Sequence, residues 1–245
     1  MAEANESGAG LDEVGLIRTI AERLKCRYET KPRYDEGIIG EKGHGPSLSE
    51  INGTPLDILV ATVLSQATTD EKSLLAYRRL KDRFGDFARV AQADEEEITR
   101  LIGVCGLGSQ KARHLKVIIS ALKRDADGLD PHLSFLKKLG KEEAFRYLCG
   151  IKGIGPKTAA CVLLFGFDWP VFPVDTHIYR LLGRLGIIGE GTSRTAAQSK
   201  MNAIVPPDLV LSLHVNMIRH GRAICKSRKP KCAECPLLDL CPVGR

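Results

Sequence analysis

Two short segments of the chain carry residues whose types and spacing could do chemistry. The first lies near the end, where four cysteines follow the spacing C-x6-C-x2-C-x5-C (Cys225, Cys232, Cys235 and Cys241). Four thiolates in a tight, proline-containing loop can close a tetrahedral zinc site or hold an iron–sulfur cluster. The spacing alone does not decide between zinc and an iron–sulfur cluster. Zinc sites usually combine one CxxC pair with a second CxxC or a pair of histidines, and here only Cys232 and Cys235 form a CxxC pair.

The second segment, 151–159, reads IKGIGPKTA and places a lysine between a glycine turn and an apolar run. Gly153 and Gly155 allow a sharp turn and the close approach of another backbone. The unpaired N–H groups at the start of the next helix, with the positive end of its dipole behind them, can hold a phosphate. A nucleotide-binding loop would need a longer glycine loop followed by Lys-Ser/Thr. A nucleic-acid phosphate is therefore the better candidate, and a plain connector between two helices is the alternative.

The elements that must position these residues are predicted to be helices nearly throughout, so the predicted fold class is all-α. Helix-start residues and apolar residues at helical spacing support this interpretation. Predicted helices begin near Leu11, Thr54, Asp94, Ser109, Glu142, Pro156, Asp175 and Asp208. The stretch 169–174 contains two prolines and is predicted to be an extended loop. The stretch 31–52, rich in glycine, proline and charge, is predicted to be a linker.

Positive charge is concentrated at the end of the chain, which favours a polyanionic partner. The net charge is +6, and residues 219–245 hold seven positive residues against two acids. The sequence has no apolar run long enough to cross a membrane, and residues 1–10 are interpreted as a disordered tail and not as a signal peptide. The eight cysteines are therefore expected to be reduced thiols or metal ligands.

Several single residues are expected to have ordinary structural roles. The four cysteines outside the terminal loop (Cys26, Cys105, Cys149 and Cys161) are expected to be buried core thiols. Lys111 and Arg113 are expected to be solvated charges on a helix. His177 is expected to pack or to form a structural hydrogen bond.

Four motifs, in the same order along the chain, resemble those of the endonuclease III family of DNA glycosylases. The segment 151–159 resembles the helix-hairpin-helix of that family, and Asp175 follows a Gly/Pro-rich loop as the aspartate of the family motif does. His-Gly-Arg at 220–222 and the cysteine spacing after it resemble the family's [4Fe–4S] segment. Two more segments, 64–70 (LSQATTD) and 106–112 (GLGSQKA), resemble further loops of these enzymes. The resemblance implies a [4Fe–4S] cluster held by the four terminal cysteines.

The resemblance covers about residues 50–245 and implies a base-excision-repair enzyme for damaged, oxidised pyrimidines that also acts as an AP lyase. Lys157 would attack C1′ of the sugar, displace the base and form a Schiff base, after which loss of the 2′ proton expels the 3′ phosphate. An ordinary lysine, with a pKa of about 10.4, is protonated at neutral pH, so burial and nearby cations must lower its pKa. Asp175 would accept the proton of the lysine or stabilise positive charge on the sugar, and could also cap the following helix.

The residues expected to contact DNA also follow from the resemblance. The partner would be double-stranded DNA containing a damaged base or an abasic site. Gly153, Gly155 and Lys152 would bind a backbone phosphate, and Lys152 stands where the family usually has proline. Gln66, which is offset from the family's pattern, would fill the space left by a flipped base or contact that base. Phosphate contacts are also expected from the basic residues of the cysteine loop: Lys226, Arg228, Lys229 and Lys231.

The predicted architecture has two helical lobes with a DNA-binding cleft between them. Residues 46–176 would form a helical bundle with the helix-hairpin-helix, and residues 11–45 with 177–245 would form the iron–sulfur cluster lobe. The protein is expected to be a monomer that binds no membrane, nucleoid-associated in the cytoplasm of a prokaryote or nuclear in a eukaryote. One alternative is a monofunctional glycosylase for mismatched thymine, uracil or adenine, although such enzymes generally lack a lysine at the position of Lys157. Another is a non-enzymatic DNA-binding protein whose cluster senses redox state.

Overall fold

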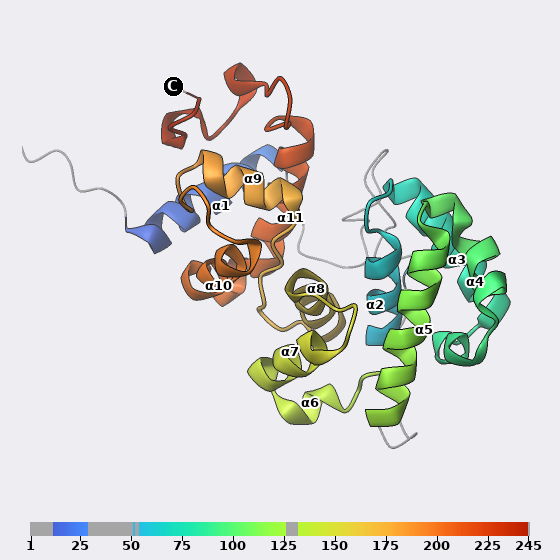
Figure 1. The fold of residues 1–245 in the computed structure, drawn as a ribbon. Helices are drawn as coiled ribbons and strands as arrows, with labels where there is room; N and C mark the ends of the chain where they lie inside the picture. Colours follow the sequence, from blue (N-terminus) through green and yellow to red (C-terminus); the bar gives the residue numbers. More distant parts are fainter. Residues whose placement is uncertain (1–11, 29–50, 52–53, 126–131, 245) are drawn as a thin grey trace, which may run out of the picture. The chain divides into compact units, whose positions relative to one another are not determined.

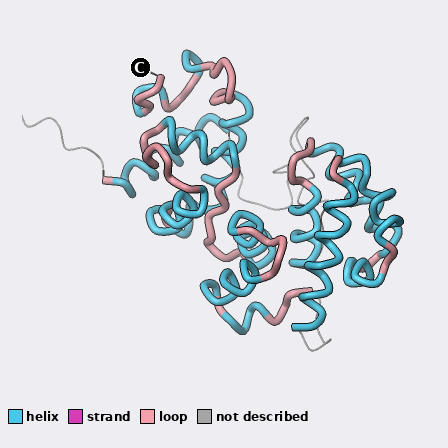
Figure 2. The backbone as a smooth tube through the Cα atoms, viewed as in Figure 1, coloured by secondary structure: helices cyan, strands magenta, loops and turns pink. Residues whose placement is uncertain are grey.

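The computed structural model describes residues 12–28, 51, 54–125 and 132–244. All regular secondary structure in these residues is helical (Figure 2), which confirms the all-α prediction. The predicted tail at 1–10 lies outside the described residues, as does the predicted linker at 31–52 apart from Ile51. No helix in the described part of the chain is both long and apolar enough to span a membrane.

The chain folds into two compact units, and the first and last parts of the sequence share one of them. Unit 1 comprises residues 1–30 and 174–245, and unit 2 comprises residues 31–173. The helices of unit 2 are α2 (Pro55–Leu64), α3 (Asp70–Phe84), η1 (Phe87–Gln92), α4 (Glu95–Ile102), η2 (Gly103–Cys105), α5 (Gly108–Asp125), α6 (Leu136–Leu139), α7 (Lys141–Gly150) and α8 (Pro156–Phe167). Those of unit 1 are α1 (Glu13–Tyr28), α9 (Thr176–Arg184), α10 (Arg194–Ile204), η3 (Pro207–Leu209), α11 (Val210–Ala223), η4 (Cys232–Glu234) and η5 (Leu238–Leu240). Figure 1 shows the course of both units.

Helix α2 is the central helix of unit 2, because it is apolar on every side. Every residue of α2 after Pro55 is buried, and the helix packs most extensively against α8. The predicted start is confirmed: Pro55 is the first helical residue, and the carboxylate of Asp57 accepts hydrogen bonds from the N–H (2.8 Å) and hydroxyl (2.7 Å) of Thr54. Lys81 on α3 donates to Asp57 at 2.5 Å, which joins α3 to the start of α2. Burial disfavours the charged carboxylate, but the hydrogen bonds from Lys81 and Thr54 outweigh burial and lower the pKa of Asp57.

In unit 1, helix α11 packs against both α1 and α9. The close contact with α9 depends on Gly221, since a Cβ atom there would lie 2.8 Å from the Cβ of His177. The cysteine loop follows directly after α11, so its start is fixed by this helix pair. Among the four cysteines outside that loop, Cys105 and Cys161 are buried and Cys149 is partly buried, whereas Cys26 is exposed. The prediction that Cys26 is a buried core thiol is wrong, because it lies on the outer side of α1.

Candidate functional site

The predicted hairpin is present between α7 and α8. Helix α7 ends at Gly150, and α8 begins at Pro156 with Gly155 as its N-cap. Gly153 has a φ of +101°, which a residue with a side chain adopts only with strain. Gly153 and Gly155 are both exposed, and within the described residues no acceptor binds the N–H group of either glycine. Two backbone donors therefore face outward beside the positive end of the α8 dipole.

Around this turn, unit 2 brings together three of the predicted site residues. Lys157 is the second residue of α8 and is partly buried, while Lys152 is exposed on the turn itself. Gln66 lies in the connection between α2 and α3, and its amide Nε2 is 3.5 Å from the hydroxyl of Thr158, a long hydrogen bond. Thr158 is buried and follows Lys157 directly, so Gln66 contacts the helix turn that carries Lys157.

Leu107 is a candidate site residue that the sequence reasoning did not single out. It lies between Gly106 and Gly108, and its side chain is 58% exposed, the most exposed large apolar side chain of unit 2 within the described residues. Its φ is +53°, a left-handed conformation that is uncommon for a residue with a large side chain. The signal in the sequence that could have indicated Leu107 is the GLG pattern at 106–108, in which one apolar residue is flanked by two glycines.

The structure corrects the expectation that Lys111 is a solvated charge on a helix. Its side chain is not solvated: Lys111 is 4% exposed, and its ammonium group is hydrogen-bonded inside unit 2. A long lysine side chain one turn into α5 is able to reach the carbonyl groups that end two neighbouring helices, which the sequence pattern did not reveal. Arg113 is exposed as expected and pairs with Glu95 at 3.3 Å.

Asp175 is the N-cap of α9 in unit 1. Its Oδ1 accepts a hydrogen bond from the backbone N–H of Ile178 at 2.8 Å, which leaves Oδ2 outside that bond. The residue before it is held by Gln198, a buried side chain on α10 whose Oε1 accepts from the N–H of Val174 at 3.3 Å. Asp175 is partly exposed, so the carboxylate has a fixed position and access to solvent. Gln198 is a positioning residue that no motif in the sequence indicated.

Helix α9 is tied to the first cysteine of the terminal loop by Arg180. The guanidinium of Arg180 donates to the carbonyl of Cys225 through Nε (3.0 Å) and Nη2 (2.8 Å), and to the carbonyl of Gly221 at 2.8 Å. Its Nη2 is also 3.3 Å from Nδ1 of His177, which gives His177 the structural contact that was expected. Burial, with the charge of Arg180 adding to it, lowers the pKa of His177 despite the opposing charge of Asp175.

All four terminal cysteines line one small cavity of about 100 Å³ in unit 1. The rest of its wall is largely apolar and includes Leu181, Leu237 and Leu238. Within the described residues, no group of three or more His, Cys, Asp or Glu side chains is arranged to bind a single metal ion. The four thiols are instead distributed over the wall of the cavity.

Donors directed at the sulfur atoms make this cavity suitable for thiolate ligands. Nη1 of Arg184 is 3.2 Å from Sγ of Cys225, and the backbone N–H of Leu237 is 3.4 Å from Sγ of Cys235. Nε2 of His220 is 3.5 Å from the same sulfur and donates to it in the tautomer that carries the proton on Nε2. Burial lowers the pKa of His220 to about 4, so its ring is neutral near pH 7. The residues present therefore fit a group with several thiolate ligands, since hydrogen bonds to ligand sulfurs are a common feature of such sites.

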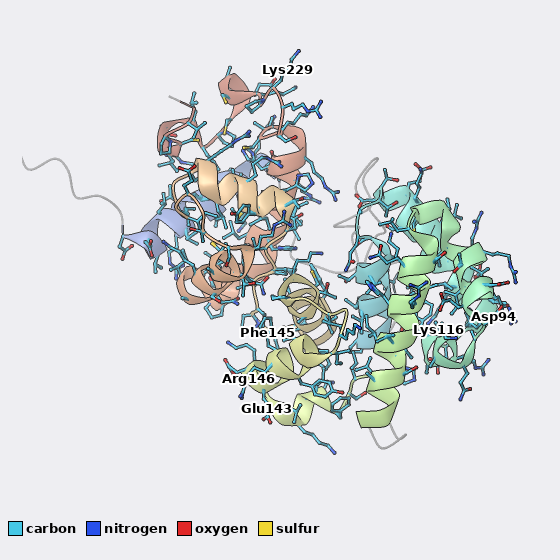
Figure 3. All side chains as sticks on the ribbon, viewed as in Figure 1. Asp94, Lys116, Glu143, Phe145, Arg146 and Lys229 are labelled. Atoms are coloured by element: carbon cyan, nitrogen blue, oxygen red, sulfur yellow. The ribbon has the colours of Figure 1, made fainter. Side chains whose placement is uncertain are left out.

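The basic side chains of the cysteine loop are on its outer surface. Lys226, Arg228, Lys229 and Lys231 are all exposed. Figure 3 shows Lys229 pointing away from the loop. Lys231 forms an ion pair with Glu234 at 3.2 Å, so its charge is partly neutralised. The loop therefore presents a positive surface, and Lys231 contributes less net charge to it than Lys226, Arg228 and Lys229 do.

Comparisons with known proteins agree with this geometry. Residues 60–207 match the family of HhH-GPD superfamily base excision DNA repair proteins, and residues 225–241 match the iron-sulfur binding domain of endonuclease III. The chain is 36% identical over 185 residues to endonuclease III of Sulfolobus acidocaldarius, covering 75% of this chain and 79% of that relative. It is 32% identical over 191 residues to endonuclease III of Thermotoga maritima, covering 78% and 84%.

A solved structure has a similar fold. A non-covalent endonuclease III–DNA complex superposes with a TM-score of 0.74 at 26% identity, covering 94% of this chain and 96% of that one. The iron–sulfur match over the cysteine loop decides between zinc and iron: the loop holds an iron–sulfur cluster, the [4Fe–4S] cofactor that the resemblance implies.

Proposed function

The chain belongs to the HhH-GPD superfamily of base excision DNA repair proteins and, within it, to the endonuclease III family, and from this premise we propose that it is a DNA glycosylase that also acts as an AP lyase on damaged pyrimidines. The observation that carries the proposal is the position of Lys157. It lies in the first turn of α8, directly after the exposed N–H groups of Gly153 and Gly155. A phosphate bound at the turn would bring the adjoining sugar to this lysine.

The hairpin would hold the DNA backbone without reading the base. Phosphate contacts position a protein on the duplex, whereas sequence is read at base edges. Gly153 and Gly155 would donate their N–H groups, and Lys152 would add a positive charge on the same turn. Because none of these contacts involves a base, the hairpin alone would bind damaged and undamaged strands alike.

Lys157 would act as the nucleophile. Its neutral Nζ attacks C1′, the bond from C1′ to the base breaks, and the base leaves with the bonding electron pair and takes up a proton. The amine gives up one proton, the C1′–O4′ bond breaks so that the sugar ring opens, O4′ takes up a proton, and the C=N bond of the protonated Schiff base forms. Removal of a 2′ proton then breaks the C3′–O3′ bond, which releases the 3′ phosphate by β-elimination. Water hydrolyses the Schiff base and frees Lys157.

Asp175 would combine two roles in one carboxylate. Oδ1 caps α9 through Ile178, and Oδ2 would accept the proton of the lysine or stabilise positive charge on the sugar. The cap fixes the orientation of the carboxylate, which is what a group acting on a transient charge requires.

Two connections in unit 2 would probe the duplex for the damaged base, and we call residues 65–69 and 106–108 the probe loops. Gln66 would fill the space of the flipped base or contact that base. Leu107, exposed between two glycines, would enter the base stack as an apolar wedge. A base has to leave the stack before C1′ becomes accessible, and such contacts lower the cost of that step.

The cysteine loop would serve as a second phosphate-binding surface. Cys225, Cys232, Cys235 and Cys241 would be the four ligands of the cluster, which when bound holds the loop in shape. The exposed Lys226, Arg228, Lys229 and Lys231 would contact backbone phosphates. The protein would act as a monomer on double-stranded DNA containing a damaged base or an abasic site, in the nucleoid or the nucleus.

Borohydride trapping tests the proposal. A duplex with one oxidised pyrimidine is incubated with the protein, and borohydride reduces any Schiff base to a stable covalent adduct. We expect the unchanged protein to form the adduct, release the base and nick the strand. Lys157→Ala should form no adduct and lose base release. Lys152→Ala, which removes a lysine from the same hairpin, should keep the adduct while binding DNA more weakly.

The other outcomes identify the alternatives. Base release without an adduct would contradict the lyase and indicate a monofunctional glycosylase. No base release from any member of a panel of damaged and mismatched duplexes would indicate a non-enzymatic DNA-binding protein. An adduct that persists in Lys157→Ala would show that another amine is the nucleophile.

A further inference from the structure

Lys111 is a buried cation whose ammonium group has an acceptor for each of its three N–H bonds. The side chain lies in the first turn of α5 and is 4% exposed. Nζ donates to the carbonyl of Leu64 at 2.9 Å and to the carbonyl of Cys105 at 3.2 Å, and lies 3.4 Å from Sγ of Cys105. A buried charge is costly unless its hydrogen bonds are satisfied, so a lysine here implies a requirement for its charge or its donors.

Both carbonyls bound by Lys111 end a helix and begin a probe loop. Leu64 is the last residue of α2 and precedes loop 65–69, whereas Cys105 is the last residue of η2 and precedes loop 106–108. The final carbonyls of a helix have no partner inside the helix and carry the negative end of its dipole, so a lysine is a suitable cap. One side chain thus caps two helices whose ends lead into the two probe loops.

The backbone of Lys111 also holds the second probe loop. Its N–H donates to the carbonyl of Leu107 at 2.9 Å. Together with the bond from Nζ to the carbonyl of Cys105, this means that Lys111 binds the chain on both sides of Gly106, whose φ is +70°. The turn that presents Leu107 is therefore fixed at two points by a single residue.

Each probe loop contains one exposed residue other than glycine in a left-handed backbone conformation. Ala67 has a φ of +51° and Leu107 a φ of +53°. Such conformations are costly for residues other than glycine, persist where the surroundings impose them, and cluster at functional sites. The two probe loops are thus alike in backbone strain and in exposure, and both begin at a carbonyl that Lys111 binds.

We propose that Lys111 is a positioning residue that fixes the two probe loops relative to each other, so that Gln66 and Leu107 engage the damaged base pair as one rigid unit. The contact from Gln66 to Thr158 extends this arrangement to the helix turn that carries Lys157. The proposal rests on the proposed glycosylase function, because it assigns the loops to extrusion of the base. The fixing of the loops itself is a physical property that can be measured without any substrate.

The first measurement compares Lys111→Met with Lys116→Met by amide hydrogen exchange. Lys116 is a matched control on the same helix (Figure 3), since its Nζ donates to the carbonyl of Ala93, just after η1, at 2.6 Å. Lys111→Met should speed exchange of the amides of Gln66 and Gly106 by about 10-fold or more, the loss expected for a hydrogen bond to a charged group. Lys116→Met should instead speed exchange near Ala93 and leave both probe loops unchanged.

The second measurement separates extrusion of the base from chemistry. Base release from a paired lesion requires extrusion, whereas β-elimination at a preformed abasic site has no base to extrude. Lys111→Met should lower base release by roughly 10- to 100-fold, the effect of misplacing a catalytic contact, while β-elimination changes much less. Lys116→Met should leave both rates unchanged. If Lys111→Met does not fold, Lys111→Arg, which keeps the charge but changes the reach, should show the same pattern to a smaller extent.

The outcomes distinguish this proposal from the proposed function. Unchanged exchange in the two probe loops would overturn the positioning role, whatever the activity. Faster exchange in the loops with an equal loss of base release and β-elimination would overturn the assignment to extrusion. A wild-type protein without base release would overturn the glycosylase proposal, and the exchange experiment would still decide whether Lys111 fixes the loops.

Discussion

At the scale of single residues, Asp175 shows how one side chain can serve the fold and the proposed reaction together. Its Oδ1 caps α9 through Ile178, so the helix needs an acceptor at this position but does not need a charge. The proposed proton transfer needs the charge. The two roles can therefore be separated by asparagine, which caps helices about as well as aspartate does and cannot accept the proton.

We predict that Asp175→Asn lowers base release by about 100-fold or more, the typical contribution of a group that moves a proton. The free energy of unfolding should change by less than about 1 kcal/mol, because the cap is kept. Single-turnover kinetics on a damaged duplex and urea unfolding give the two quantities.

A cap without a proposed catalytic role provides the control for Asp175. Ser193 caps α10, where its hydroxyl accepts from the N–H of Ala196 at 3.1 Å. Ser193→Ala should cost about 1 kcal/mol of stability and leave base release unchanged. If Asp175→Asn kept full activity, the aspartate would be a cap alone.

At the scale of secondary-structure elements, the contact between α9 and α11 depends on a glycine that is helical and not part of a turn. A Cβ at Gly221 would lie 2.8 Å from the Cβ of His177, and both atoms are attached directly to helix backbones, so neither can move alone. We predict that Gly221→Ala destabilises the protein by about 1–3 kcal/mol, as overpacking does. Urea unfolding, followed by circular dichroism and by the visible absorbance of the cluster, measures the loss.

Gly183 on α9 is the matched control for Gly221. It is also inside a helix, but a Cβ there meets no atom within 4 Å. Gly183→Ala should therefore be neutral or stabilise the protein by up to about 1 kcal/mol, because alanine favours the helix. Equal effects of the two substitutions would show that helix propensity, and not the close contact, decides the result.

The elements were more predictable from the sequence than the contacts between them. The start of α2 was predictable because Thr54, Pro55 and Asp57 are residue types that helix N-termini favour. The hairpin was predictable because glycine often marks a backbone conformation that other residues avoid. The roles of Lys111 and Gln198 were not predictable, since each acts on a backbone group far away in the sequence. A lysine near the start of a helix is usually solvated, and only the tertiary structure shows that Lys111 reaches the ends of α2 and η2.

At the scale of the whole molecule, the distribution of charge is more informative than the total. The net charge is +6, and residues 219–245 alone hold seven positive residues against two acids. The structure refines this count, because Lys231 is already paired with Glu234 while Arg228 is exposed. Each phosphate contact releases counterions, so contacts can be counted from the dependence of DNA affinity on salt.

We predict that Arg228→Ala lowers the slope of log affinity against log salt by about one, as expected for the loss of one phosphate contact. The loss of affinity should be the same for damaged and undamaged duplexes, because a phosphate contact carries no information about the base. Lys231→Ala should have a smaller effect on the slope, since Glu234 already neutralises part of its charge. Fluorescence anisotropy over a series of salt concentrations gives all of these slopes.

Glu234→Gln supplies the test with the opposite sign. Removing this carboxylate releases Lys231 from its ion pair, so the slope should become steeper by up to about one, and affinity at low salt should rise. A rise in affinity from the loss of a negative charge, combined with a fall from the loss of Arg228, would place the loop on the DNA backbone. If both slopes stayed at the wild-type value, the positive surface of the cysteine loop would not contact DNA, and the excess charge at the end of the chain would need another explanation.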